Sequence, residues 1–222
     1  MDLDFVYFSN VKKFDGKKLR RLNLSEIGQI AGRAGRYLND GSFGITGDCK
    51  EISPEEVELL ENHKFEEIRT LFWRNSNLNF NNPISLIKSL EEKPQVEWLR
   101  KIHECEDEKA LKYFLKDQRI LNIGFDKKTL MLLWECCQIP DFVKKTYGNH
   151  FEVIGNVFKF LTSKKGLISE DYMRLQLMKL DKLEGNVDSL SNRIANVRTW
   201  SYVSNKNNWV ENQSYWIEKT KH

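Results

Sequence analysis

The sequence lacks a long apolar run, a recognisable export signal and any internal repeat. No apolar stretch approaches the roughly 18 residues needed to span a bilayer, so we do not expect a membrane protein. The first residues show no basic segment followed by an apolar one, and a secretory signal is therefore not expected. With 40% hydrophobic and 30% charged residues, the composition is that of a folded globular protein.

Cysteine and histidine are scarce, with four of each, and neither forms a ligand pattern. No CxxC pair occurs and two cysteines are adjacent, which is typical of neither a zinc site nor a disulfide framework. We therefore expect no metal site, and reduced thiols in or near a core, in a reducing compartment. The cysteines are Cys49, Cys105, Cys136 and Cys137.

A phosphate-binding loop is also missing, because the pattern G-x-x-x-x-G-K-[ST] occurs nowhere in the sequence. Gly16 and Lys17 come nearest, but they are followed by Lys18. Val11 stands where the first glycine belongs. The acidic residues 106–108 follow no hydrophobic strand and begin a charged helix, so they are not expected to hold Mg²⁺. We expect neither ATP nor Mg²⁺ to bind tightly to this chain alone.

Positive charge is concentrated near the N-terminus. The net charge is only +3, but residues 11–36 contain eight basic side chains against two acidic ones. Clustered lysine and arginine can bind the phosphates of a nucleic acid. The candidate nucleic-acid-binding residues are Lys12, Lys13, Lys17, Lys18, Arg20 and Arg21.

The first 50 residues have the pattern of a small α/β segment. Residues 4–9 and 41–47 are predicted strands, and the first is apolar on both faces, as buried strands of parallel sheets are. Asn23 and Glu26 predict the capped start of a short helix, which ends in the glycine-rich residues 32–36.

From Ser53 onward the sequence is predominantly helical. Ser53, Pro54 and Glu56 form a strong helix start. Apolar residues at three- and four-residue steps between Met173 and Trp200 predict a packing stripe in a helical bundle, with a coiled coil interrupted at Gly185 as the alternative. The predicted helices span residues 54–63, 83–92, 107–120, 126–138, 149–162, 169–184, 187–203 and 207–218.

The stretch most informative about chemistry is QIAGRAGR at residues 29–36, which fits Q-x-x-G-R-x-G-R. Hydrolysis of ATP spreads negative charge over the γ-phosphate oxygens, and an inserted guanidinium stabilises that charge. Such an arginine finger is worth about 10³–10⁵ in rate. Arg33 and Arg36 are three residues apart and are expected on one helix face.

The other fixed positions of this stretch fit the same chemistry. Gly32 and Gly35 remove side chains, so that the segment can closely approach the nucleotide and a neighbouring domain. Gln29 can orient the attacking water. The alternative interpretation is a basic, glycine-rich helix end with no catalytic role.

Residues 29–36 resemble motif VI of superfamily-two helicases, which lies on the second of their two RecA-like domains. With the surrounding residues, the chain more specifically resembles the Suv-type helicases. These are the mitochondrial degradosome RNA helicases and their α-proteobacterial relatives. The likeness is carried by residues 2–9, 13–16, 24–29 and 40–47, and more weakly by residues 68–75, 133–141 and 198–202.

The resemblance implies a mixed, mainly α fold. Residues 1–50 would be the remnant of a RecA-like α/β domain, namely the C-terminal portion of the second one, and residues 51–222 a helical bundle region. The chain would be the C-terminal fragment of an ATP-dependent RNA helicase that acts in RNA turnover. Arg33 and Arg36 would be its arginine fingers, and Gln29 a γ-phosphate or water contact. ATP and Mg²⁺ would be cofactors of the complete helicase.

The implied partners are RNA, the missing N-terminal helicase half and a ribonuclease of a degradation complex. A different class of function is a stand-alone RNA-binding or nuclease-docking helical module without ATPase activity. Exposed tryptophans would stack on bases in such a module, although tryptophan more commonly packs in a core. We expect a bacterial cytoplasmic location, with the mitochondrial matrix as the alternative. The candidate tryptophans are Trp73, Trp200, Trp209 and Trp216.

Overall fold

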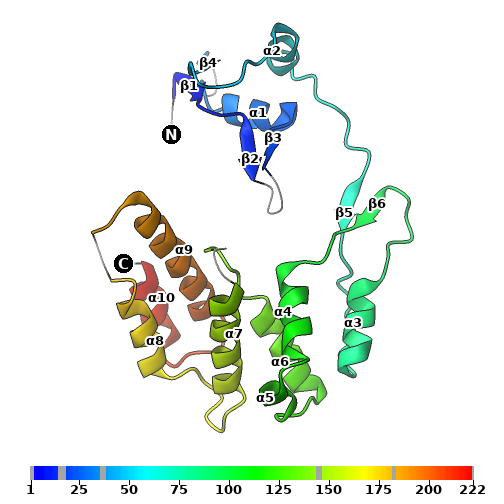
Figure 1. The fold of residues 1–222 in the computed structure, drawn as a ribbon, viewed down its shortest axis with the longest axis vertical. Coiled ribbons are helices and arrows are strands. Elements are labelled where there is room, and N and C mark those ends of the chain that lie inside the picture. The colour runs from blue at the N-terminus through cyan, green and yellow to red at the C-terminus, as the bar shows by residue number, and fades with distance from the viewer. Residues whose placement is uncertain (1–2, 15–18, 36–38, 144–146, 182–183, 222) are drawn as a thin grey trace. The chain divides into compact units, whose positions relative to one another are not determined.

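The computed structural model describes residues 3–14, 19–35, 39–143, 147–181 and 184–221. Its architecture is mixed and mainly helical, as predicted, and the chain divides into two units (Figure 1). Unit 1 is Met1–Arg69 and unit 2 is Thr70–His222. None of the described helices has both the length and the apolar character that crossing a membrane requires.

Unit 1 holds four short strands and two helices among its described residues. They are β1 (Phe5–Phe8), β2 (Lys12–Phe14), β3 (Leu19–Arg21), α1 (Leu24–Ala31), β4 (Ser42–Ile45) and α2 (Pro54–Glu61). Strands β1 and β4 pair in parallel, and β2 and β3 form an antiparallel hairpin.

Unit 2 is mostly helical. It contains β5 (Leu71–Trp73), α3 (Pro83–Glu91), β6 (Leu99–Lys101), α4 (Glu106–Phe114), α5 (Gln118–Leu121), α6 (Lys127–Cys137), α7 (Tyr147–Leu161), α8 (Glu170–Met178), α9 (Val187–Ser204) and α10 (Gln213–Lys221). Strands β5 and β6 pair in parallel. Helix α6 packs on both α4 and α7, and α9 packs on α10.

The division between the units falls after Arg69, whereas the sequence analysis set it at residue 50. The physical reason is that α2 packs on α1 and completes the core of unit 1. Ile52, which precedes α2, and Leu60 within it are buried with Ile27 of α1. The small apolar surface of β1 and α1 is therefore covered by residues that the sequence analysis assigned to the helical region.

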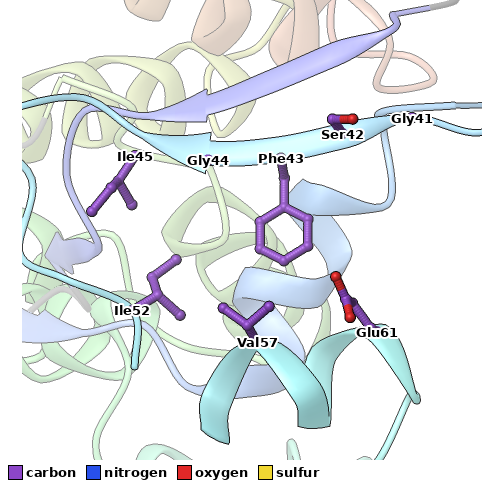
Figure 2. Close-up of a pocket in the computed structure, with 8 residues that line it drawn as sticks. All are labelled: Gly41, Ser42, Phe43, Gly44, Ile45, Ile52, Val57 and Glu61. Atoms are coloured by element: carbon purple, nitrogen blue, oxygen red, sulfur yellow. The ribbon is translucent and has the colours of Figure 1, made fainter. Parts of the chain in front are cut away.

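The core of unit 1 lies on one side of the parallel pair β1–β4. Phe8 is buried, and Val6 is half-buried against the same cluster. A cavity of about 350 Å³ lies between β4 and α2. Figure 2 shows Phe43 pointing toward Val57 across it. The two predicted strands of this segment are thus confirmed as β1 and β4.

The alternate residues of β1 face outward. Phe5 is 61% exposed and Tyr7 is 65% exposed, and their rings lie 6.5 Å apart, centroid to centroid. Strands of parallel sheets are ordinarily covered on both faces. One face of β1 is therefore without such a cover among the described residues of unit 1.

Helix starts follow the predicted caps. In α1, the Asn23 side chain accepts a hydrogen bond from the Glu26 N–H at 2.9 Å, and the Glu26 carboxylate accepts one from the Asn23 N–H. In α2, Ser53 and Glu56 form the same reciprocal capping box, with proline in the first turn. These contacts satisfy backbone donors that the first helical turn leaves unpaired.

Three predicted helices of unit 2 differ from the observed ones. The predicted helix 107–120 is divided into α4 and α5, because Asp117 caps a new helix by accepting from the Arg119 N–H at 2.9 Å. The predicted helix 169–184 ends at Met178 in α8. Helix α10 begins only at Gln213, since Asn212 has a left-handed φ of 53°.

The predicted packing stripe along α8 and α9 is only partly present. Met173 and Trp200 lie in the core of unit 2. Val187 and Ile194 are 80% and 59% exposed, so these two members of the predicted stripe do not pack in the core. The N-terminal half of α9 extends beyond the core formed by the other helices of this unit.

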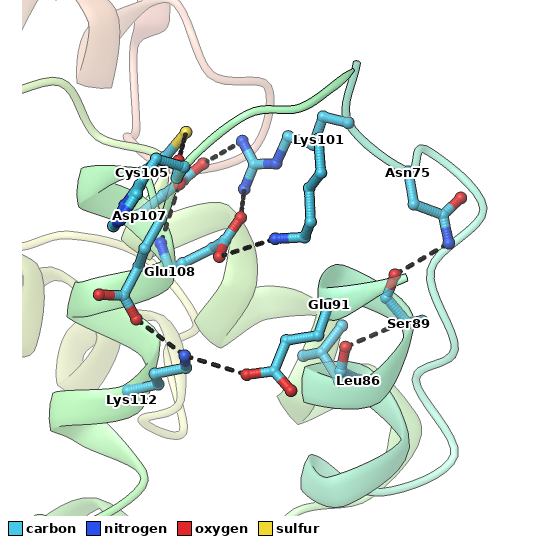
Figure 3. Close-up of polar contacts among 12 residues, drawn as sticks. Asn75, Leu86, Ser89, Glu91, Lys101, Cys105, Asp107, Glu108 and Lys112 are labelled. Carbon is cyan, nitrogen blue, oxygen red and sulfur yellow. Dashed lines mark hydrogen bonds and ion pairs between the residues drawn. The ribbon is translucent and has the colours of Figure 1, made fainter. Parts of the chain in front are cut away.

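A polar network joins β5 and β6 to α4 (Figure 3). Arg74 follows β5, and its guanidinium lies 2.8 Å from an Asp107 carboxylate oxygen and 3.6 Å from one of Glu108. Lys101 of β6 lies 3.9 Å from the other Glu108 oxygen. The Arg74 guanidinium also covers the Trp134 ring at 5.1 Å.

Glu108 is the most deeply buried member of this network, with 2% of its surface exposed. Burial raises the pKa of its carboxyl, although Lys101 and Arg74 oppose the shift. An ionised carboxylate in such a position depends on its cationic neighbours, because removing one of them leaves a charge that is neither hydrated nor paired.

We expect Arg74→Met to destabilise unit 2 by about 3 kcal/mol, because Glu108 would keep only a distant lysine. All six tryptophans of the chain lie in unit 2, so urea unfolding followed by tryptophan fluorescence reports on this unit. Lys88→Met, at an exposed position of α3, is the matched control. Equal midpoints for the two variants would contradict this account of the network.

Candidate functional site

The motif at residues 29–36 begins on α1 and continues into a turn. Gln29 lies in the last helical turn and Arg33 follows the helix, and both side chains are exposed. The capping box at the start of α1 and the buried Ile27 fix this helix on the core of unit 1. Arg36 lies outside the described residues.

Arg33 does not lie on a helix face as expected, and its expected partner on that face, Arg36, lies outside the described residues. Helix α1 ends at Ala31, and the Arg33 N–H bonds to the Ile30 carbonyl at 3.1 Å, in a tighter turn than an α-helix has. Gly35 then takes a left-handed φ of 71°, which a helix cannot accommodate. Spacing alone predicted a helical face because it carries no information about where the helix stops.

Gly35 and Gly41 are required by close backbone packing. A Cβ on Gly35 would lie 2.5 Å from the Asn39 carbonyl oxygen, and a Cβ on Gly41 would lie 2.1 Å from the Gly35 nitrogen. The Gly35 N–H also bonds to the Leu3 carbonyl at 2.7 Å, just before β1. The turn after Arg33 is thereby attached to the start of β1.

Gly32 and Gly35, the two glycines of the motif, differ in how closely other backbone atoms approach them. A Cβ on Gly32, the C-cap of α1, would meet only the Gly28 carbonyl oxygen, at 3.1 Å. Gly32 is exposed, whereas Gly35 is half-buried in the crossing described above. The structure thus gives Gly35 a role in shaping the turn, and the contact of Gly32 and Gly35 with a nucleotide stays a prediction.

A shallow groove of about 420 Å³ lies beside Gln29. Gly28 and the Phe65 ring both line the groove. They pack closely, because a Cβ added to Gly28 would lie 2.7 Å from the Phe65 ring. Ser25 and His63 also line it. Gln29 is therefore one of the residues that line a concave surface of unit 1.

The basic hairpin β2–β3 is attached to both helices of unit 1 by ion pairs. Lys13 and Arg20 are directly opposite in the hairpin and both contact Glu26, with Arg20 at 2.8 Å. The Arg21 guanidinium forms a bidentate ion pair with the Glu56 carboxylate of α2. The hydrogen bonds from Arg20 and Lys13 lower the pKa of Glu26, so this carboxylate stays charged at neutral pH.

These ion pairs engage part of the positive charge that the sequence analysis assigned to phosphate binding. Among the six candidate phosphate-binding residues, Lys13, Arg20 and Arg21 each contact a carboxylate in the structure. Lys12 is exposed, and Lys17 and Lys18 lie outside the described residues. The structure brings Lys12 and Arg21 together as cross-strand neighbours. Binding of phosphates by this segment stays a prediction.

Three of the four tryptophans proposed for base stacking are core residues. Trp200, Trp209 and Trp216 are 3%, 4% and 2% exposed, so that interpretation is wrong for them. Phe72 and Trp98, which are 79% and 54% exposed, were not among the candidates. Their exposure depends on the pairing of β5 with β6, for which these short strands carry no clear sequence signal.

A metal-binding cluster is not found in the described part of the chain. No three His, Cys, Asp or Glu side chains converge there as a metal ion would need. Cys136 and Cys137 are buried in the core of unit 2, and Cys49 and Cys105 are half-buried, all as free thiols. The cysteines are therefore where the sequence analysis expected them.

We expect Gly35→Ala to destabilise unit 1 by at least about 2 kcal/mol, because the new Cβ requires a strained φ and meets backbone atoms. Hydrogen exchange of the α1 amides measures this loss. Gly47→Ala is the matched control, since a Cβ there has no neighbour within 4 Å. If both variants leave α1 equally protected, the crossing of Gly35 and Gly41 does not hold the turn.

The chain is similar over part of its length to three RNA helicases. It is 40% identical over 60 residues to the DExH-box ATP-dependent RNA helicase DExH16, mitochondrial, of Arabidopsis thaliana, covering 27% of this chain and 10% of that protein. The ATP-dependent RNA helicase SUV3, mitochondrial, of Oryza sativa subsp. japonica gives the same identity over the same length and shares. The DExH-box ATP-dependent RNA helicase DExH11 of Arabidopsis thaliana is 41% identical over 54 residues, covering 24% of this chain and 4% of that protein.

The matches are partial in both directions. The aligned part spans about a tenth of the length of the first two relatives. No family model matches the chain, and no solved structure matches it. The findings support a relationship between this chain and superfamily-two helicases.

Proposed function

We propose that this chain is the C-terminal part of an ATP-dependent RNA helicase of the Suv type, acting in RNA turnover. The observation that carries the proposal is the motif Q-x-x-G-R-x-G-R, which begins on a capped helix and exposes Gln29 at the helix end and Arg33 in the turn that follows. The partial likeness to three RNA helicases supports it. Residues 1–50 would belong to a RecA-like domain, whose remaining strands would come from the preceding part of the helicase.

Gln29 and Arg33 fit one side of a nucleotide triphosphate. Bound ATP would supply the phosphoryl group whose hydrolysis drives unwinding. The Arg33 guanidinium is exposed and positively charged, so it can stabilise negative charge that develops on the γ-phosphate. The Gln29 amide can accept and donate hydrogen bonds and would orient the attacking water. We propose Arg36 as the second arginine finger.

The other side of the nucleotide would be held by a different segment. The sequence has no phosphate-binding loop, and its described part has no acidic cluster suited to Mg²⁺. We therefore propose that the missing helicase half holds Mg²⁺ and most of the ATP, and that this chain completes the site.

The names of the relatives support RNA as substrate and a mitochondrial location. All three are named as RNA helicases, and two of them as mitochondrial. We propose both properties for this chain, in place of the bacterial cytoplasm that the sequence analysis put first. A ribonuclease partner is a sequence-based expectation to which neither the structure nor the comparisons add.

The coding DNA upstream of Met1 provides the first test. We expect an in-frame phosphate-binding loop followed by an acidic box, because the proposed ATP site needs both. A stop codon directly upstream, with no separate gene for the other half, would contradict the proposal.

In the complete helicase, we expect Arg33→Ala to lower RNA-stimulated ATP hydrolysis by about 10³-fold, because one arginine finger is removed. Arg33→Lys should not restore the rate, since an ammonium lacks the forked guanidinium geometry. The control is Lys64→Ala, which removes an exposed charge from the same unit. If Arg33→Ala hydrolyses ATP as fast as this control, Arg33 is not a finger.

A further inference from the structure

The parallel pair β5–β6 exposes large aromatic side chains in unit 2. Phe72, in the middle of β5, is 79% exposed, and Trp98, directly before β6, is 54% exposed. Figure 1 shows the two strands side by side. Large aromatic rings are costly to leave in water, and clustered ones on a surface indicate a binding site.

The pairing register places these rings beside an arginine. Phe72 is the cross-strand neighbour of Arg100, so both side chains project from the same face of the pair. The Trp98 carbonyl accepts a hydrogen bond from the Leu71 N–H at 2.9 Å, so the ladder continues to this residue. Trp98 lies in the turn directly before β6, two residues from Arg100. We name Phe72, Trp98 and Arg100 the β5–β6 platform.

Ion pairs attach both strands to α4. Lys101 reaches Glu108, and Arg74, which follows β5, reaches Asp107. These ion pairs hold both strands at their C-terminal ends (Figure 3). The platform therefore stands on a fixed support, which lowers the entropic cost of using it for binding.

Arg100 is available to a ligand. It is exposed, and within the described part of the chain it has neither an ion pair nor a hydrogen-bonded carboxylate. Its neighbour Lys101, by contrast, faces Glu108. Basic side chains also outnumber acidic ones in unit 2 as a whole. A ligand that carries both negative charge and flat aromatic groups would match this surface.

We propose that the β5–β6 platform binds single-stranded RNA. Two bases would stack on Phe72 and Trp98, and Arg100 would pair with a backbone phosphate. Sheets that bind RNA with exposed aromatic side chains work in the same physical way. The choice of RNA over DNA rests on the proposed function, whereas stacking on the platform does not.

The test measures binding of the full chain to a fluorescein-labelled oligouridine of about 12 nucleotides by fluorescence anisotropy. We expect Phe72→Thr and Trp98→Thr each to weaken binding by about 5- to 100-fold, because each removes one stacking surface. Threonine keeps the strand preference of these positions. Because either ring can stack on a base, Phe72→Trp and Trp98→Phe should bind oligouridine as tightly as the wild type does.

Arg100→Gln separates charge from stacking. It should reduce the dependence of log affinity on log salt by about 0.7, whereas Phe72→Thr should leave that slope unchanged. A matched control is Tyr215→Ala, which removes an aromatic side chain that is 52% exposed on α10 and should bind as the wild type does. Duplex RNA should bind less tightly, since its bases already stack on one another.

The proposal is overturned if the wild-type chain does not bind oligouridine, or if Phe72→Thr and Trp98→Thr bind as tightly as the Tyr215→Ala control. A platform covered by another protein segment would give that second result. Failure here is distinguishable from failure of the proposed function, because the Arg33→Ala measurement of ATP hydrolysis does not involve the platform.

Discussion

The structure depends on how two short parallel strand pairs, β1–β4 and β5–β6, are covered. A parallel pair has two faces and two edges, and each uncovered part leaves apolar side chains or backbone groups in water. In unit 1, the helices α1 and α2 cover one face of β1–β4, where Phe8 is buried. In unit 2, ion pairs attach both strands of β5–β6 to α4. Phe5 and Tyr7 of the first pair and Phe72 of the second remain exposed.

The position of the motif follows from this arrangement in unit 1. The Gly35 N–H bonds to the Leu3 carbonyl, and the next carbonyl, that of Asp4, accepts from the Ser42 N–H at the start of β4. The turn that carries Arg33 is therefore connected to both strands of the pair. Any segment that covers the exposed face of β1 would also stabilise this turn, which links completion of the proposed domain to the placement of the proposed arginine finger.

Local contacts made much of the fold predictable from the sequence. The capping residues Asn23 and Ser53 form hydrogen bonds within their own first helical turns, so the starts of α1 and α2 needed no tertiary information. The pairing of β5 with β6 joins Leu71 to Leu99, which are far apart in the sequence. The three-residue strands LFW and LRK are too short to predict this pairing from their sequence pattern. For the same reason Trp98 could not be told apart from the buried Trp200, because identical side chains differ here only in tertiary surroundings. The glycine-rich residues 32–36 did predict where α1 ends, but the left-handed conformation of Gly35 depends on its crossing with Gly41 and could not be predicted.

We propose that unit 1 is an incomplete α/β domain whose strand β1 receives further cover in a longer protein. Hydrogen exchange of the monomeric chain, read by mass spectrometry, tests it most directly. The account predicts that the amides of Phe5–Phe8 exchange far sooner than those of α6 and α7, which lie in the core of unit 2. It also predicts that the same β1 amides become protected when the chain is part of the complete helicase. Protection of β1 in the monomer as strong as that of α6 would contradict it, since unit 1 would then be a finished domain.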